Sequence, residues 1–291
     1  MDPRRWLAAP APWPGTVVYL PLLYLVGWLA SRPLAWLMPG WRSDQVDLAG
    51  LALALVLLLL TLPLRLRRHW QASHPWQSLG VVAPLKACLK ALIQGLLKAL
   101  LLLGPLVLLL LLGGQARWLG ELGGAQLLNA LALLLGVGFA EELLFRGWLW
   151  GELEQLLSPQ QALGLQAAIF ALVHPWYRLP PSEAIALLGG LVLLGLVLAL
   201  QRRADGGVLW GSVGLHGGLV GGWFALQNGL LQLSPATPTW LIGPGGASPN
   251  PIGGALGWLG LLSLLWIRRR YLQSNLEQQI AQQSPQRSRV S

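Results

Sequence analysis

The chain has 291 residues, of which 54% are hydrophobic and only 11% are charged, and its mean hydropathy is +0.56. Soluble domains carry about 25% charged residues, so this composition excludes an ordinary soluble protein and indicates a polytopic membrane protein. The net charge of +9 does not indicate nucleic acid, because the basic residues stand at the ends of apolar runs, where they meet lipid headgroups.

The amino-terminal sequence Met-Asp-Pro-Arg-Arg leads into a proline-rich stretch rather than a compact apolar region with a small-residue cleavage site. We therefore expect no removable signal peptide. Leucine-rich runs near the ~20 residues that span a bilayer then recur along the chain. They predict an all-α membrane helix bundle of about eight transmembrane helices, at residues 16–38, 48–64, 87–113, 126–150, 160–175, 184–201, 207–229 and 252–267.

Three features divide this sequence of helices. The first helix is expected to break near Arg32-Pro33, and the uncharged, Gly- and Pro-rich connection 230–251 is expected to be an external loop. We predict N-terminal membrane helices with a basic cytoplasmic segment over 1–86 and a membrane core over 87–272. The polar residues 273–291 are expected to form a disordered cytoplasmic tail.

The basic residues predict the orientation of the helices. If both termini are cytoplasmic, fourteen basic residues lie on the cytoplasmic side and four on the other, namely Arg32, Arg42, Arg117 and Arg178. The fourteen are Arg4, Arg5, Arg65, Arg67, Arg68, Lys86, Lys90, Arg202, Arg203, Arg268, Arg269, Arg270, Arg287 and Arg289. We therefore expect a multi-pass protein with both termini in the cytoplasm.

Two adjacent acids, Glu141 and Glu142, are the only acids inside the predicted helices, and each costs roughly 2.5–3.5 kcal/mol at bilayer depth. Glu142 and Arg146 are four residues apart and share a helix face, so they are expected to pair. Glu141 then lies on another face without a cation of its own helix, which makes it the acid that is free to act. A purely structural polar network of all three residues is the alternative.

Two of the four histidines lie in apolar surroundings. His174 ends an apolar helix just before Pro175, and His216 lies among Gly214, Gly218 and Gly222, whose four-residue spacing favours close helix packing. A glutamate and a histidine are enough to activate water and to protonate a leaving amine. The three side chains, Glu141, His174 and His216, are therefore expected to meet in one site.

These residues form three ordered motifs: Glu-Glu-x-x-x-Arg at 141–146, Phe-x-x-x-His at 170–174, and His216 in a glycine-rich helix. This pattern resembles the CPBP family of intramembrane proteases, also called the type II CAAX prenyl endopeptidase or Abi family, over residues 125–230. The resemblance implies an intramembrane endopeptidase that cleaves a membrane-associated protein or peptide near the membrane surface. It implies catalytic roles for Glu141, His174 and His216, with Glu142 and Arg146 as structural support.

One position departs from the family pattern. The third motif often continues to an asparagine four residues after the histidine, where this chain has Val220. The amide that would help to hold an oxyanion is thus missing, and Ser212, one turn before His216, is a candidate substitute donor. Val220 favours the alternative of a catalytically inactive membrane scaffold or immunity-type protein with the same fold.

Other mechanisms remain beside this one. A carboxylate and two histidines also form a catalytic zinc set, but no short-spaced ligand pair lies on one helix, so we favour a mechanism without metal or other cofactor. A His-Glu-x-x-His motif is absent, and Ser212 with His216 makes a poor serine protease because no oxyanion donors are assigned. A proton-coupled transporter would use the same polar groups but lacks repeat or broken-helix signals.

Overall fold

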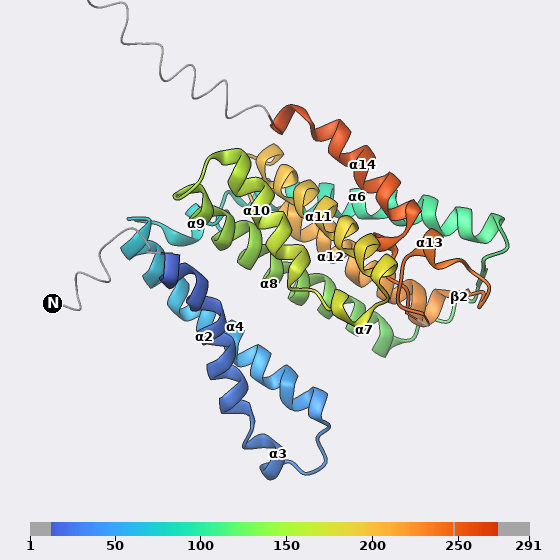
Figure 1. The fold of residues 1–291 in the computed structure, drawn as a ribbon, viewed down its shortest axis with the longest axis horizontal. Coiled ribbons are helices and arrows are strands. Elements are labelled where there is room, and N and C mark those ends of the chain that lie inside the picture. The colour runs from blue at the N-terminus through green and yellow to red at the C-terminus, as the bar shows by residue number, and fades with distance from the viewer. Residues whose placement is uncertain (1–12, 247, 273–291) are drawn as a thin grey trace, which may run out of the picture. The chain divides into compact units, whose positions relative to one another are not determined.

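The computed structural model describes residues 13–246 and 248–272, and helices dominate these residues (Figure 1). The predicted tail 273–291 and the first twelve residues lie outside the described residues. The chain divides into two compact units, with the boundary between Ser78 and Leu79. This boundary precedes residue 86 because the segment after Leu79 already belongs to the second unit, where Gly80 accepts a hydrogen bond from the Leu209 amide.

The first unit is a helical hairpin. Its elements are α2 (Trp13–Ser31), α3 (Leu34–Leu37), α4 (Ser43–His69) and α5 (Pro75–Ser78). As expected, the first helix stops before Pro33. The buried residues of α4 recur every four positions and face α2: Val46, Gly50, Ala54, Leu58, Leu62 and Leu66.

The second unit is built around α12 (Trp210–Ala225), which lies among α6, α8 and α11 in Figure 1. Its helices before α12 are α6 (Leu85–Leu112), α7 (Gly124–Ala132), α8 (Gly138–Glu142), α9 (Trp150–Glu154), α10 (Pro159–Leu172) and α11 (Pro181–Ala204). The later ones are α13 (Thr239–Ile242) and α14 (Ala255–Arg268).

Glycines let α12 approach its neighbours at backbone distance. A Cβ on Gly214 would overlap the Leu92 carbonyl, one on Gly218 would lie 2.7 Å from the Ala99 Cβ, and both contacts are with α6. Another row of glycines, Gly217 and Gly221, faces the helix of Ala130 and Leu134 in the same way. The predicted close packing along the glycine spacing is therefore confirmed, on two faces of the helix rather than one.

Five helical segments of the described residues are long and apolar enough to cross a membrane: Pro14–Leu37, Ser43–His69, Leu85–Leu112, Gly124–Glu154 and Pro181–Ala204. This is an all-α polytopic membrane fold, as predicted. The other three expected spans coincide with the shorter helices α10, α12 and α14. The number eight therefore stays a prediction.

Two short strands were missed by the sequence analysis. β1 (Ala116–Trp118) follows α6, and β2 (Leu231–Leu233) follows α12 at the start of the expected loop 230–251. They pair antiparallel, with Arg117 opposite Gln232. Three residues each are too few for an alternating pattern to stand out in the sequence.

We predict that Gly214→Ala destabilises the second unit, because the added methyl group would overlap the backbone of α6. Overpacking of this kind costs about 1–3 kcal/mol. The measurement is the thermal melting of the purified protein in detergent. Gly104→Ala is the matched control, since a Cβ at Gly104 meets nothing within 4 Å. Equal melting temperatures for the two variants would contradict the assigned packing.

Candidate functional site

The two glutamates lie on α8, a short α-helical stretch within the continuous helix Gly124–Glu154. Wider π-helical turns flank it on both sides, at Leu133–Val137 and Leu143–Leu149. Such turns are rare and occur mostly at functional sites, where they change the direction in which neighbouring side chains point. Gly138 brings this stretch against the backbone of Gly217 on α12, one residue from His216.

Glu142 and Arg146 form the predicted pair. Arg146 Nη1 donates to Glu142 Oε1 at 2.8 Å, and both side chains are fully buried. The same Oε1 atom lies 2.9 Å from His216 Nδ1, a contact that the sequence analysis did not foresee. Glu142 therefore joins its own helix to α12.

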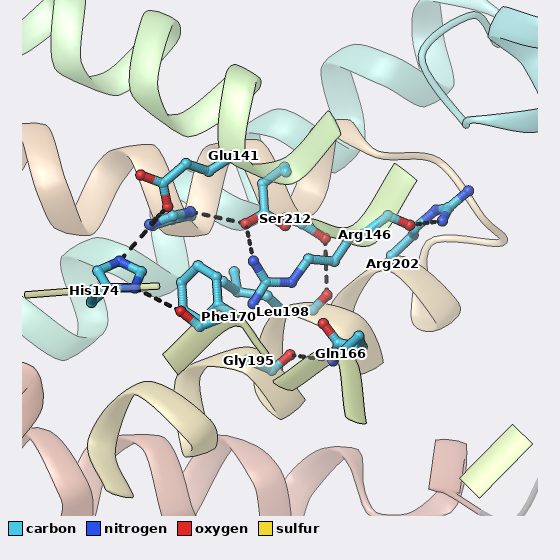
Figure 2. A network of polar contacts seen from close by, with 11 residues as sticks. Glu141, Arg146, Gln166, Phe170, His174, Gly195, Leu198, Arg202 and Ser212 are labelled. Atoms are coloured by element: carbon cyan, nitrogen blue, oxygen red, sulfur yellow. Dashed lines mark hydrogen bonds and ion pairs between the residues drawn. The ribbon is translucent and has the colours of Figure 1, made fainter. Parts of the chain in front are cut away.

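Glu141, His174 and His216 meet as predicted. Glu141 Oε2 lies 3.9 Å from His174 Nε2 and 3.8 Å from His216 Nε2. Figure 2 shows Glu141 and His174 pointing toward one another from different helices. The side chains of Glu141 and His174 are 30% and 24% exposed, whereas that of His216 is only 4% exposed.

The hydrogen bonds of the two imidazole rings define their free nitrogens. His174 Nδ1 lies 2.7 Å from the Phe170 carbonyl, which can only accept, so Nδ1 carries a proton. His216 Nδ1 likewise donates to Glu142, whose carboxylate is paired with Arg146. Both Nε2 atoms are thus left facing Glu141 Oε2, a buried atom with no hydrogen-bond partner among the described residues.

Phe170 packs against both histidines and the arginine of the site. Its ring makes edge contacts with the rings of His174 and His216, at 4.8 and 5.8 Å between centroids, and the Arg146 guanidinium lies 4.1 Å above it. The motif Phe-x-x-x-His is explained by this geometry. A smaller side chain in place of Phe170 would remove the ring contacts of both imidazoles and of the arginine.

α10 delivers Phe170 and His174 to the depth of Glu141. Glu141 precedes the end of α9 at Glu154 by 13 residues, and His174 follows the start of α10 at Pro159 by 15. At ~1.5 Å per residue, both lie about 20 Å from the α9–α10 connection. α10 is held against α11 at Gly195, whose carbonyl accepts from Gln166 at 3.2 Å (Figure 2).

Three polar residues have roles that the sequence analysis missed or assigned differently. Ser212 is not a free donor near His216, because its buried hydroxyl donates to the Leu198 carbonyl at 2.9 Å. Arg202, expected at the cytoplasmic interface, donates instead to the carbonyls of Arg146 and Gly207. Glu152, just beyond the predicted helix, is also buried and accepts from the Trp148 indole at 3.0 Å.

Glu141, His174 and His216 have the donor types that zinc prefers, but their spacing is wide. Tetrahedral ligands about 2.0–2.1 Å from zinc lie ~3.3–3.4 Å apart, and the Glu141–histidine separations here are 3.8 and 3.9 Å. No group of three or more His, Cys, Asp or Glu residues within 13–246 and 248–272 is placed to hold a metal ion. In this geometry the three residues do not fit the ion as a ligand set.

Two protein families match parts of the chain. Residues 4–74 match a domain of unknown function (DUF8676), so the first unit carries no functional assignment from this comparison. Comparisons with curated proteins and with solved structures gave no match. Residues 123–221 match the family described as type II CAAX prenyl endopeptidase Rce1-like, and this range contains Glu141, Glu142, Arg146, His174 and His216. The segment 123–221 is therefore a domain of the Rce1-like type II CAAX prenyl endopeptidase family, within an integral multi-pass membrane protein.

Proposed function

We propose that this protein is an intramembrane endopeptidase that hydrolyses a peptide bond of a membrane-associated protein or peptide, with Glu141 as the general base. One observation supports this proposal above the others: Glu141 Oε2 and the two Nε2 atoms surround one point, too far apart to bond directly. A carboxylate oxygen accepts hydrogen bonds, so a proton donor is expected between Glu141 Oε2 and the ring nitrogens. A water molecule at this point would lie next to a carboxylate that can take its proton.

The proton positions assign a role to each ring. Water has two protons, and two acceptors are available for them, Glu141 Oε2 and Nε2 of a neutral His174. His216 lies between two carboxylates, and in the proposed reaction its Nε2 carries a proton. Its Nε2–H is then the donor that faces the oxygen of the scissile carbonyl.

The reaction follows from these roles. Glu141 takes one proton from the water, and the water oxygen attacks the carbonyl carbon of the peptide. The negative charge that develops on the carbonyl oxygen is stabilised by His216 Nε2–H. Glu141 then gives its proton to the peptide nitrogen, and the carbon–nitrogen bond breaks to leave a carboxylic acid and an amine.

Glu142 and Arg146 support this chemistry without touching the reacting atoms. The Glu142 carboxylate holds the proton on His216 Nδ1, which fixes the direction of Nε2. Arg146 supplies the opposite charge for that carboxylate in the buried interior. In this role the pair resembles the carboxylate that orients a catalytic histidine in other hydrolases.

We predict that Glu141→Gln abolishes proteolysis while the protein stays folded. Glutamine has the size of glutamate but cannot accept the proton, and loss of a positioned base costs about 10²–10⁴ in rate. The assay uses purified protein in detergent and a membrane-anchored peptide, offered with and without a prenyl group. Glu121→Gln, an exposed acid outside the site, is the matched control.

Three outcomes would contradict this proposal. If Glu141→Gln cleaves normally and a folded Glu142→Gln does not, the two glutamates have been given each other's roles. If a chelator abolishes cleavage and zinc restores it, the reaction needs a metal. If the parent protein cleaves no peptide, the inactive scaffold, which the half-buried Val220 in place of the family asparagine favours, becomes the better explanation.

We predict that Glu142→Gln lowers thermal stability and yield, because it leaves the Arg146 charge buried without its partner. Breaking a buried ion pair costs roughly 3–5 kcal/mol. Arg146→Ala is expected to lower the melting temperature in the same way, since it leaves the buried Glu142 with His216 as its one remaining partner among the described residues. A Glu142→Gln protein that melts like the parent would show that the pair does not stabilise the fold.

We also propose that both termini lie in the cytoplasm, on the basis of the fourteen-to-four distribution of basic residues. A reporter enzyme fused after Ser291 that is active only in the cytoplasm is the expected result. A reporter active only on the opposite side would require an odd number of spans or the reverse orientation.

A further inference from the structure

A groove of about 400 Å³ lies between α6 and α14, away from the candidate site. Its walls are leucines of both helices, with Pro105, Gly260 and Ile267, and its only two polar lining residues are Lys98 and Ser263. Glu141, His174 and His216 do not line it. The groove exists because the helices touch at Gly260, where a Cβ would lie 2.7 Å from Leu102 Cδ2, and leave room on either side of this contact.

One end of the groove is positively charged. The Lys98 ammonium donates to the Gln94 carbonyl at 3.1 Å, and no carboxylate of the described residues lies within 4 Å of it. Arg268 follows the lining residue Ile267 and interacts electrostatically with Lys98. Its guanidinium donates only to neutral oxygen in this region, that of Gln201 at 3.2 Å.

Among the described residues, the acid that interacts electrostatically with both cations is Asp205, which forms no salt bridge with either. Asp205, in the turn after α11, is held by Gln201 Nε2 at 2.7 Å rather than by a cation. Burial raises the pKa of the Asp205 carboxyl, which disfavours its charged form. A lysine and an arginine at the edge of an apolar groove, without a salt bridge among the described residues, favour the binding of an anion from outside the protein.

The length of the groove matches one lipid leaflet. From Lys98 to Leu109 the wall runs over eleven residue steps, or about 16 Å, which is half of the ~30 Å hydrocarbon core. α14 has 14 residues and is about 21 Å long, shorter than the core, and it is followed directly by Arg269 and Arg270. A short helix of this kind thins the bilayer locally and draws lipid headgroups toward its arginines.

From these observations we propose that the α6–α14 groove is a binding site for one anionic phospholipid. An acyl chain fills the leucine-lined groove, and the phosphate lies between Lys98 and Arg268. A zwitterionic lipid fits less well, because its own cation would approach two protein cations. Basic pockets between membrane helices bind anionic headgroups in this way.

The test is native mass spectrometry of the full-length protein in detergent, titrated with phosphatidylglycerol or phosphatidylcholine of identical acyl chains. We expect one phosphatidylglycerol to remain bound at concentrations at which phosphatidylcholine does not. Lys98→Gln should weaken phosphatidylglycerol binding about fivefold, the effect of one basic residue near a headgroup. Ser263→Phe, which fills the groove from an exposed position of α14, should abolish binding of both lipids.

Lys86→Gln is the matched control, because it removes an equal charge from an exposed position on the same helix outside the groove. Equal phosphatidylglycerol retention by the Lys98→Gln and Lys86→Gln proteins would overturn the site. So would equal retention of the two lipids by the parent protein. Displacement of the bound lipid by a prenylated peptide at equal concentration would make the groove a substrate site instead.

Discussion

The structure of the second unit depends on one buried carboxylate. Glu142 Oε1 accepts from Arg146 at 2.8 Å on its own helix and from His216 at 2.9 Å on α12, with no exposure to solvent. A charge in this position is tolerable only because both partners are present. The candidate site is assembled on this contact, since it fixes the ring on which the proposed oxyanion contact depends.

The two adjacent glutamates, Glu141 and Glu142, lie in opposite environments. Glu142 is fully buried and bonded to two partners, while its neighbour Glu141 is 30% exposed and has an oxygen without a partner among the described residues. One acid is therefore held by two partners, and the other keeps an oxygen that can accept a further hydrogen bond. Catalytic sites commonly combine a fixed supporting shell with one unsatisfied reactive group.

The sequence allowed more of the candidate site to be predicted than of the details of the fold. The four-residue spacing predicted the Glu142–Arg146 pair, and the cost of isolated polar groups in a membrane predicted that Glu141 and the two histidines converge. The contact between His216 and Glu142 could not be foreseen, because it spans 74 residues and depends on how α12 packs. Nor could the hydrogen bonds of Arg202 and Ser212, since they depend on which backbone carbonyls of the folded chain pack against these side chains.

The glycines of α12 and the strand pair after it both affect how α12 is held along its axis against α6. Helices that meet through glycine have few protruding side chains, so little in that interface resists a sliding of one helix along the other. β1 continues from α6 and β2 from α12, and their pairing of Ala116 with Leu233 joins the two helices at one end. The short ribbon thus connects the ends of α6 and α12 by pairing their following segments. A slip of one residue would carry His216 about 1.5 Å along the helix axis, enough to break its contact with Glu142.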